Sequence, residues 1–115
     1  IYLSDFDVGF GMMSGFAETD NPPKSNPVYT AYCLYCGNGV PGQLARNHSF
    51  DLTAVHFAFE GDSEFFAVSD SEQVVIENKD SNRFVPAENG NHYRVILRKS
   101  KEELGAYYDA ILNSY

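Results

Sequence analysis

Two cysteines are the residues of this chain whose spacing points most directly to chemistry. Cys33 and Cys36 are the only cysteines among the 115 residues, and two residues separate them. A pair with this spacing can act as a redox site, as half of a zinc site, as a small disulfide or as an attachment point for another chain. Which of these is available depends on the backbone that carries the pair.

The redox and zinc alternatives both meet an obstacle in the sequence. A redox pair needs its first cysteine at a helix N-terminus, where the helix dipole lowers the thiol pKa, but the residues before Cys33 predict a strand. A zinc site would add His48 and His56, and seven residues separate these histidines where zinc fingers have about three to five. We therefore predict no metal and no cofactor, and a redox or zinc module is the third alternative.

A disulfide between Cys33 and Cys36 requires a bend in the chain. Side chains three residues apart on an extended strand point to opposite faces, so the bond needs a bend at Leu34 and Tyr35. The glycines of the adjoining run, residues 37–42, would permit it. In a secretory compartment we predict that the two cysteines are oxidised to each other. A bond from one of them to a partner chain, which would give a heterodimer, stays open as the other alternative.

Metal-free RNA cleavage is the one enzymatic reaction that the remaining polar residues could perform. It needs a carboxylate base, a histidine acid and a cation for the phosphate. The candidates are His56, Glu60, His92, Arg94 and Arg98. On a predicted strand His56 and Glu60 share a face but lie about 13 Å apart, at roughly 3.3 Å per residue, so this pair cannot act alone.

One stretch of sequence bears on this enzymatic alternative. The run "NRFVPAENGNHYRVI", residues 82–96, resembles the arginine-containing strand and the following strand of small acidic fungal guanyl-specific ribonucleases. The resemblance implies a secreted ribonuclease. The chain lacks that family's cysteine framework, and a solvated polar sheet face explains the same residues with fewer assumptions. The ribonuclease is therefore the alternative, and we predict no such activity.

The period of the apolar residues predicts an α+β fold. Residues 100–115 repeat at helical spacing, and Ser100 with Glu103 forms a capping-box pattern, although Gly105 costs this helix about 1 kcal/mol relative to alanine. We predict one antiparallel sheet of about six strands with one C-terminal helix packed on it, as a single domain over residues 1–115. Alternation with a period of two predicts the strands at residues 5–12, 28–35, 53–60, 64–69, 73–77 and 92–99.

Charge and composition limit the partners. The formal net charge of −8 argues against binding along a nucleic-acid backbone. No apolar run approaches the roughly 20 residues that a membrane-spanning helix needs. The chain begins with Ile1 and not Met, which favours removal of a preceding segment, and Asn47 heads an acceptor site for N-linked sugar, Asn47-His48-Ser49. These features favour a secreted, extracellular protein.

Size, the predicted removal of a preceding segment, the acceptor site for N-linked sugar and the sparse cysteines together resemble the small secreted effector and killer-toxin proteins of fungi. The resemblance is one of type across the whole chain and rests on no diagnostic motif, so it transfers no functional residue. It implies a non-enzymatic protein that binds a host or competitor target through protein contacts.

Overall fold

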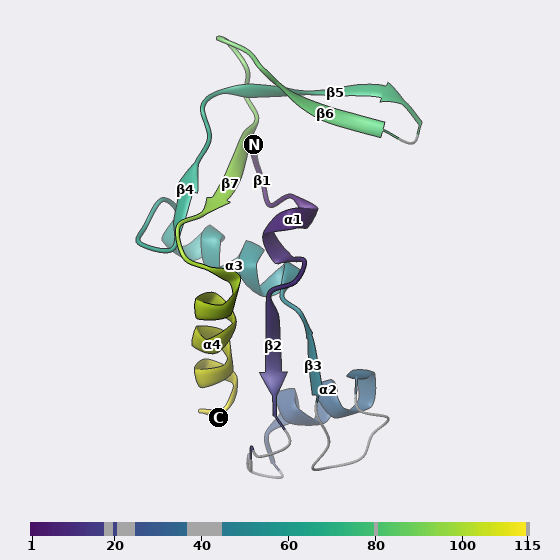
Figure 1. Ribbon diagram of the computed structural model, residues 1–115, viewed down its shortest axis with the longest axis vertical. Coiled ribbons are helices and arrows are strands. Elements are labelled where there is room, and N and C mark those ends of the chain that lie inside the picture. Colours follow the sequence, from purple (N-terminus) through teal and green to yellow (C-terminus); the bar gives the residue numbers. More distant parts are fainter. Residues whose placement is uncertain (18–19, 21–24, 37–44, 80, 115) are drawn as a thin grey trace.

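The computed structural model describes residues 1–17, 20, 25–36, 45–79 and 81–114. Within them the chain forms four helices and seven strands (Figure 1). The α+β class and the C-terminal helix are therefore confirmed. In chain order the elements are β1 (Tyr2–Leu3), α1 (Phe6–Gly9), β2 (Met13–Phe16), α2 (Pro27–Cys36), β3 (Ala45–His48), α3 (Phe50–Glu60), β4 (Phe66–Val68), β5 (Glu72–Asn78), β6 (Ser81–Pro86), β7 (Tyr93–Leu97) and α4 (Lys101–Leu112).

The described strands form three small sheets, so the prediction of a single antiparallel sheet of six strands is wrong. Strand β7 lies between β1, which is parallel to it, and β4, which is antiparallel. Strands β2 and β3 form an antiparallel pair, and so do β5 and β6. The strands predicted over residues 64–69, 73–77 and 92–99 are confirmed as β4, β5 and β7, whereas β6 lies in a segment that the alternation does not mark.

Helix α3 replaces the strand predicted over residues 53–60. Its inner side buries Phe57, while its outer side carries Val55 and Phe59, the latter with 87% of its surface exposed. Because apolar residues occupy both sides of the helix, they alternate along the chain with the period of a strand. Gly61, directly after this segment, is a typical helix-terminating residue, and it ends α3 with a φ of 63°.

Helix α2 replaces the strand predicted over residues 28–35, and its first turn explains why. Oδ1 of Asn26 accepts hydrogen bonds from the backbone N–H groups of Val28 (2.9 Å) and Tyr29 (3.1 Å), as a helix N-cap does. Pro27 follows at the first helical position, where its missing N–H leaves no bond unmade. The Asn-Pro pair starts a helix here and overrides the strand preference of the β-branched and aromatic residues that follow.

The predicted strand at residues 5–12 is the short helix α1 followed by a turn. Oδ1 of Asp5 accepts a hydrogen bond from the N–H of Phe6 (2.7 Å) and caps the helix. Gly11 then adopts a φ of 80°, a conformation that glycine reaches without steric cost, and the chain turns into β2. The apolar residues of this segment consequently point in several directions, not to one face of a sheet.

Two hydrophobic clusters hold the described elements together. In the first, Met12, Phe66 and Leu104 are fully buried among α3, α4 and the β4–β7 pair. In the second, Phe16 and Ala45 of the β2–β3 pair meet residues of α2 and the end of α4. The capping box of α4 is confirmed, because Oγ of Ser100 accepts from the N–H of Glu103 while that glutamate's side chain accepts from the N–H of Ser100.

The β5–β6 hairpin extends away from this body, as Figure 1 shows at the top of the view. It makes the molecule long, with extents of 51 × 33 × 20 Å. The radius of gyration is 16.9 Å, against about 13 Å for a compact domain of this length. Two-stranded hairpins are marginally stable on their own in water, so the interactions at the base of this hairpin matter for its position.

An ion pair at the base of the hairpin should make the stability depend on pH. Both nitrogens of the Arg94 fork lie 2.8 Å from the Glu72 carboxylate, whose side chain is 8% exposed. These hydrogen bonds hold the pKa of Glu72 below its ordinary value of 4.5. A carboxyl with a depressed pKa contributes stability above its unfolded pKa and loses it as the pH falls through the folded pKa.

We therefore expect Glu72→Gln to lower the melting temperature at pH 7 and to differ less and less from the wild type as the pH drops below 4.5. Melting temperatures of both proteins between pH 7 and pH 3 test this. Glu77→Gln removes an exposed carboxylate of the same hairpin and is the matched control, with little effect at any pH. A difference between Glu72→Gln and the wild type that does not change with pH would contradict the expectation.

Candidate functional site

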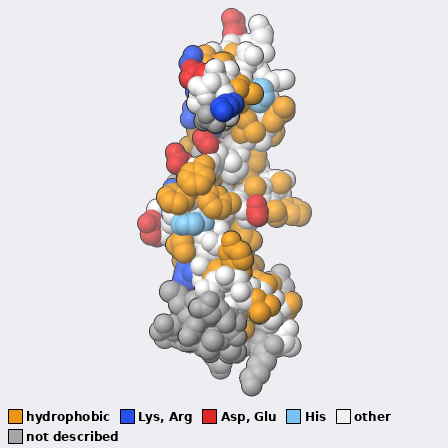
Figure 2. Space-filling model, turned by 90° about the vertical axis from the view of Figure 1, so that its right-hand side faces the viewer, with side chains coloured by type: hydrophobic (Ala, Val, Ile, Leu, Met, Phe, Trp, Pro, Cys, Tyr) orange, Lys and Arg blue, Asp and Glu red, His pale blue; other side chains and the backbone are white. Residues whose placement is uncertain are grey.

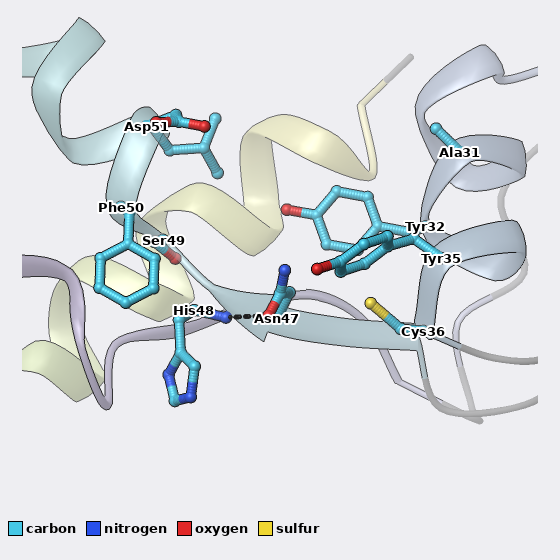
Figure 3. A pocket seen from close by; sticks show the side chains of 10 residues that line it. Ala31, Tyr32, Tyr35, Cys36, Asn47, His48, Ser49, Phe50 and Asp51 are labelled. Atoms are coloured by element: carbon cyan, nitrogen blue, oxygen red, sulfur yellow. Dashed lines mark hydrogen bonds between the residues drawn. The ribbon is translucent and has the colours of Figure 1, made fainter.

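A cavity of about 640 Å³ opens beside the end of α2 (Figure 3). Tyr32, Tyr35 and Cys36 of α2 form one wall, and Phe50 and Asp51, in the first turn of α3, form the opposite wall. In Figure 3 the two tyrosine side chains reach out from α2 across the cavity, toward the strand and the helix on the other side. The cavity thus combines aromatic walls with one thiol and one carboxylate.

The cysteines lie on α2, so the predicted strand bend at Leu34 and Tyr35 is wrong. Cys33 is buried in the second hydrophobic cluster and Cys36 is partly exposed, and both are free thiols in this structure. Burial, with a smaller effect of Cys33, raises the pKa of Cys36 above its ordinary value of 9.0. The pair also lies at the C-terminal end of the helix, where the dipole disfavours a thiolate. This is the opposite of what a redox site or a thiol nucleophile needs.

A disulfide between these two residues stays a prediction, and alkylation decides it. If the two thiols are free, as they are in the structure, Cys36 should react with iodoacetamide in the native protein, slowly because of its raised pKa, and Cys33 should react only after unfolding. Mass spectrometry without reductant measures both steps. If neither cysteine is modified even in the unfolded protein until reductant is added, the two are bonded as the sequence predicts. The run 37–42, expected to permit the bend, lies outside the described residues.

His48 borders the same cavity but does not face Cys36. Figure 3 shows its ring directed away from the thiol. Nδ1 of His48 accepts a hydrogen bond from the N–H of Gly11 (3.0 Å), and the ring lies 4.7 Å from that of Phe10. His56, the other histidine of the hypothetical zinc set, lies on α3. Among the described residues no group of three or more His, Cys, Asp or Glu side chains could hold a metal ion.

An exposed aromatic cluster adjoins the cavity. We define it as Phe6, Phe10, His48 and Phe50, whose ring centres are 4.8, 4.7, 5.7 and 5.4 Å apart in a closed cycle. The three phenylalanines are 60%, 46% and 36% exposed. Figure 2 shows hydrophobic side chains gathered along the face of the molecule to which α1 and the hairpin belong. A packed group of rings that remains open to solvent is a typical protein-binding feature.

The pattern of the sequence does not predict this cluster. Phe6 and Phe10 carry a local signal, because apolar rings four residues apart meet when the chain forms a helical turn. The alternation of residues 5–12 predicts a strand, however, and in a strand these two rings would not be expected to meet. His48 and Phe50 come from a distant part of the chain, and the turn at Gly11 together with the pairing of β2 and β3 brings them to α1.

The ribonuclease candidates His56 and Glu60 are close together, contrary to the prediction. They lie one turn apart on α3, and Nε2 of His56 is 3.2 Å from Oε2 of Glu60. The spacing of about 13 Å predicted for a strand is therefore wrong, because four residues of an α-helix rise by about 6 Å and return to the same side. Nε2 is buried beside Glu60 without a well-aligned hydrogen bond.

Aromatic rings enclose His56. Nδ1 of His56 lies 3.0 Å from the hydroxyl of Tyr108, and burial raises the pKa of that tyrosine to about 12. The tyrosine is protonated at neutral pH, and the cavity of about 220 Å³ that opens beside the histidine is lined mainly by apolar side chains. The rings within 5.6 Å of the imidazole centre are those of Phe65, Phe66, Tyr107 and Tyr108.

The remaining candidates have partners of their own. Arg94 is bound to Glu72, and Arg98 donates to Asp62 at 2.8 Å. His92 exchanges backbone hydrogen bonds with Glu72 at the base of the hairpin. Both arginines are thus held by carboxylates. Within the described residues, neither arginine nor His92 forms a hydrogen bond or an ion pair with His56 or Glu60, so the base, acid and cation that RNA cleavage requires are not joined.

Asn47, the predicted glycosylation site, lies on β3 and is half-buried at the cavity. Its Oδ1 accepts a hydrogen bond from the N–H of His48 (2.8 Å), which Figure 3 marks. Attachment of a sugar there stays a prediction. If it occurs, the sugar would lie next to the aromatic walls of the cavity.

No known protein-family model, curated protein or solved structure matches this chain. In the part of the chain that the structure describes, no helix is both long and apolar enough to cross a bilayer.

Proposed function

We propose that this chain is a secreted, non-enzymatic binding protein of the effector or toxin type, which binds a protein target of a host or a competitor through the aromatic cluster. The observation that carries the proposal is the exposure of Phe6, Phe10 and Phe50 while their rings remain packed on one another and on His48. Aromatic side chains dominate the energetics of protein interfaces, and an already ordered cluster loses little entropy when a partner covers it.

The surroundings of the cluster support a partner with basic groups. Asp5, Asp7 and Asp51 are exposed next to its phenylalanines in the sequence. Acidic groups at the rim of an apolar patch attract a partner with lysines or arginines around its own apolar centre. The neighbouring cavity, with the exposed Tyr35 on its wall, gives the side chains of such a partner a place to enter.

Loss of the cluster should weaken target binding without unfolding the protein. The test is saturable binding of dye-labelled protein to intact plant, fungal and bacterial cells. We expect the double variant Phe6→Ser/Phe10→Ser to bind at least about tenfold more weakly, because interface aromatics contribute about 2 kcal/mol or more each. The matched control is Val55→Ser/Phe59→Ser, which removes two exposed apolar side chains from α3 and should leave binding unchanged.

Three results would contradict the proposal. The first is the absence of saturable binding to every cell type, and the second is equal loss of binding in both double variants. The third is specific RNA cleavage by the purified protein that disappears in His92→Ala, which would favour the ribonuclease instead. Circular dichroism of each variant confirms that it is folded.

A further inference from the structure

The β5–β6 hairpin is incompletely covered by the rest of the chain. Ile76 is 77% exposed, and a cavity of about 500 Å³ lies between the hairpin residues Val74 and Phe84 and the N-terminal residues Ile1 and Phe6. Figure 1 shows the hairpin reaching outward from the body. Two strands with apolar side chains rarely persist alone in water, so an additional partner for this hairpin would stabilise it.

The outer edge of β5 offers unpaired backbone groups. In the pairing of β5 with β6, Gln73 lies opposite Val85 and Val75 opposite Arg83. Glu72 directs its N–H and C=O away from β6, to His92 at 2.9 and 3.1 Å. Since alternate residues of a strand direct these groups to alternate sides, Val74 and Ile76 also direct theirs outward. No hydrogen bond within the described residues occupies the N–H and C=O groups of Val74 and Ile76.

The opposite edge of the hairpin is less suited to pairing. Pro86 ends β6 and faces Glu72 across the ladder, so it stands at an outward position where it has no N–H to donate. Proline at an edge is a common protection against strand addition. Strand β5 has no proline, so its outer edge is the one open to a further strand.

We propose that two copies of this chain associate through the outer edges of their β5 strands, which pair antiparallel about Val75 and join the two hairpins into one four-stranded sheet. In this register Val74 of each copy lies opposite Ile76 of the other, and four backbone hydrogen bonds form between the outward groups of these residues. Gln73 then lies opposite Glu77, so no like charges face each other directly. The sequence of β5 is thus complementary to itself, as a two-fold interface requires.

Charge explains why the two copies would meet at this place. Each chain carries a net charge of −8, and most of its surface would repel a second copy. Residues 72–86 hold three acids and two bases, so this segment contributes only −1. Arg94 also neutralises Glu72 at the base of the hairpin. Because the hairpin projects from the body, pairing at its edge keeps the acidic parts of the two copies apart.

The test is the mass of the protein in solution as a function of concentration. Sedimentation equilibrium of the wild type should show a rise from 12.9 kDa toward twice that value. Val74→Pro removes one outward N–H from each copy and leaves the bonds to β6 intact, and Ile76→Lys puts a cation opposite Val74 of the other copy. We expect both variants to weaken association at least about tenfold. Phe59→Lys makes the same change as the second variant on α3 and should associate like the wild type.

Each other outcome overturns the proposal. A wild type that stays monomeric up to its solubility limit excludes a second copy and leaves a strand of another protein as the occupant of this edge. A dimer that persists in both hairpin variants, or that dissociates in Phe59→Lys as well, uses a different surface. If Val74→Pro fails to fold, Ile76→Lys with its control still decides the question.

Discussion

Phe66→Ala is expected to lower the free energy of unfolding by about 3–5 kcal/mol, the range for loss of a fully buried phenylalanine. Phe66 lies on β4 and is completely buried in the first hydrophobic cluster. Its ring contacts that of Phe57 at 5.7 Å, edge to face, and that of His56 at 4.9 Å. The residue therefore joins the β4–β7 pair to α3, and its removal leaves a cavity between them.

Urea unfolding monitored by circular dichroism measures this effect. Phe59→Ala is the matched control, since it makes the same chemical change on the exposed side of α3 and should change the free energy by about 0.5 kcal/mol or less. Equal effects of the two substitutions would mean that the first cluster is not the core that the structure describes. A destabilisation of only about 1 kcal/mol by Phe66→Ala would lead to the same conclusion.

The parts of the fold that sequence predicts are those where a local signal agrees with the tertiary structure. Ser100 and Glu103 cap α4 in the way that their spacing indicates. Strand β7 alternates because one of its sides is more buried than the other. The sequence does not predict helix α3, because Val55 and Phe59 make its outer side as apolar as its inner side. The apolar residues of this helix therefore do not mark its buried side.

The helical state of α3 also decides which candidate site residues meet. His56 and Glu60 change from a distant pair to a contact at 3.2 Å solely because their segment is a helix. The aromatic cluster joins Phe10 to His48, which lie far apart in the chain, and no local pattern predicts such a meeting. Exposed aromatic residues are also hard to recognise from sequence, because an apolar residue is taken by default to belong to the core.

Gly105→Ala is the second substitution with a large expected effect, and we expect it to destabilise the protein. Alanine is the better helix former by about 1 kcal/mol, so the helix α4 alone would be stabilised. A Cβ at Gly105, however, would lie 2.5 Å from the backbone oxygen of Met13 on β2, far inside contact distance. The glycine that weakens the helix is therefore the one that lets it lie directly against the strand.

The helix cannot move away at low cost, because polar contacts on both sides of Gly105 hold it to β2, to β3 and to the residue Phe10 that precedes β2. Lys101 donates to the backbone oxygen of Phe10, and the Asp109 carboxylate accepts from the N–H of Gly15 at 2.9 Å and from Arg46 at 2.7 Å. Relief of the clash would stretch these bonds. We expect Gly105→Ala to lower the free energy of unfolding by about 2 kcal/mol, typical of overpacking.

The neighbouring residue supplies the control. Ala106→Gly removes a methyl group from the exposed side of the same helix turn and should cost about 1 kcal/mol through helix propensity alone. If propensity governed both positions, Gly105→Ala would stabilise the protein by as much as Ala106→Gly destabilises it. Urea unfolding of the two variants distinguishes the cases. The close approach of α4 to β2 requires that both substitutions destabilise the protein. A Gly105→Ala variant that is more stable than the wild type would show that the helix does not lie against the strand.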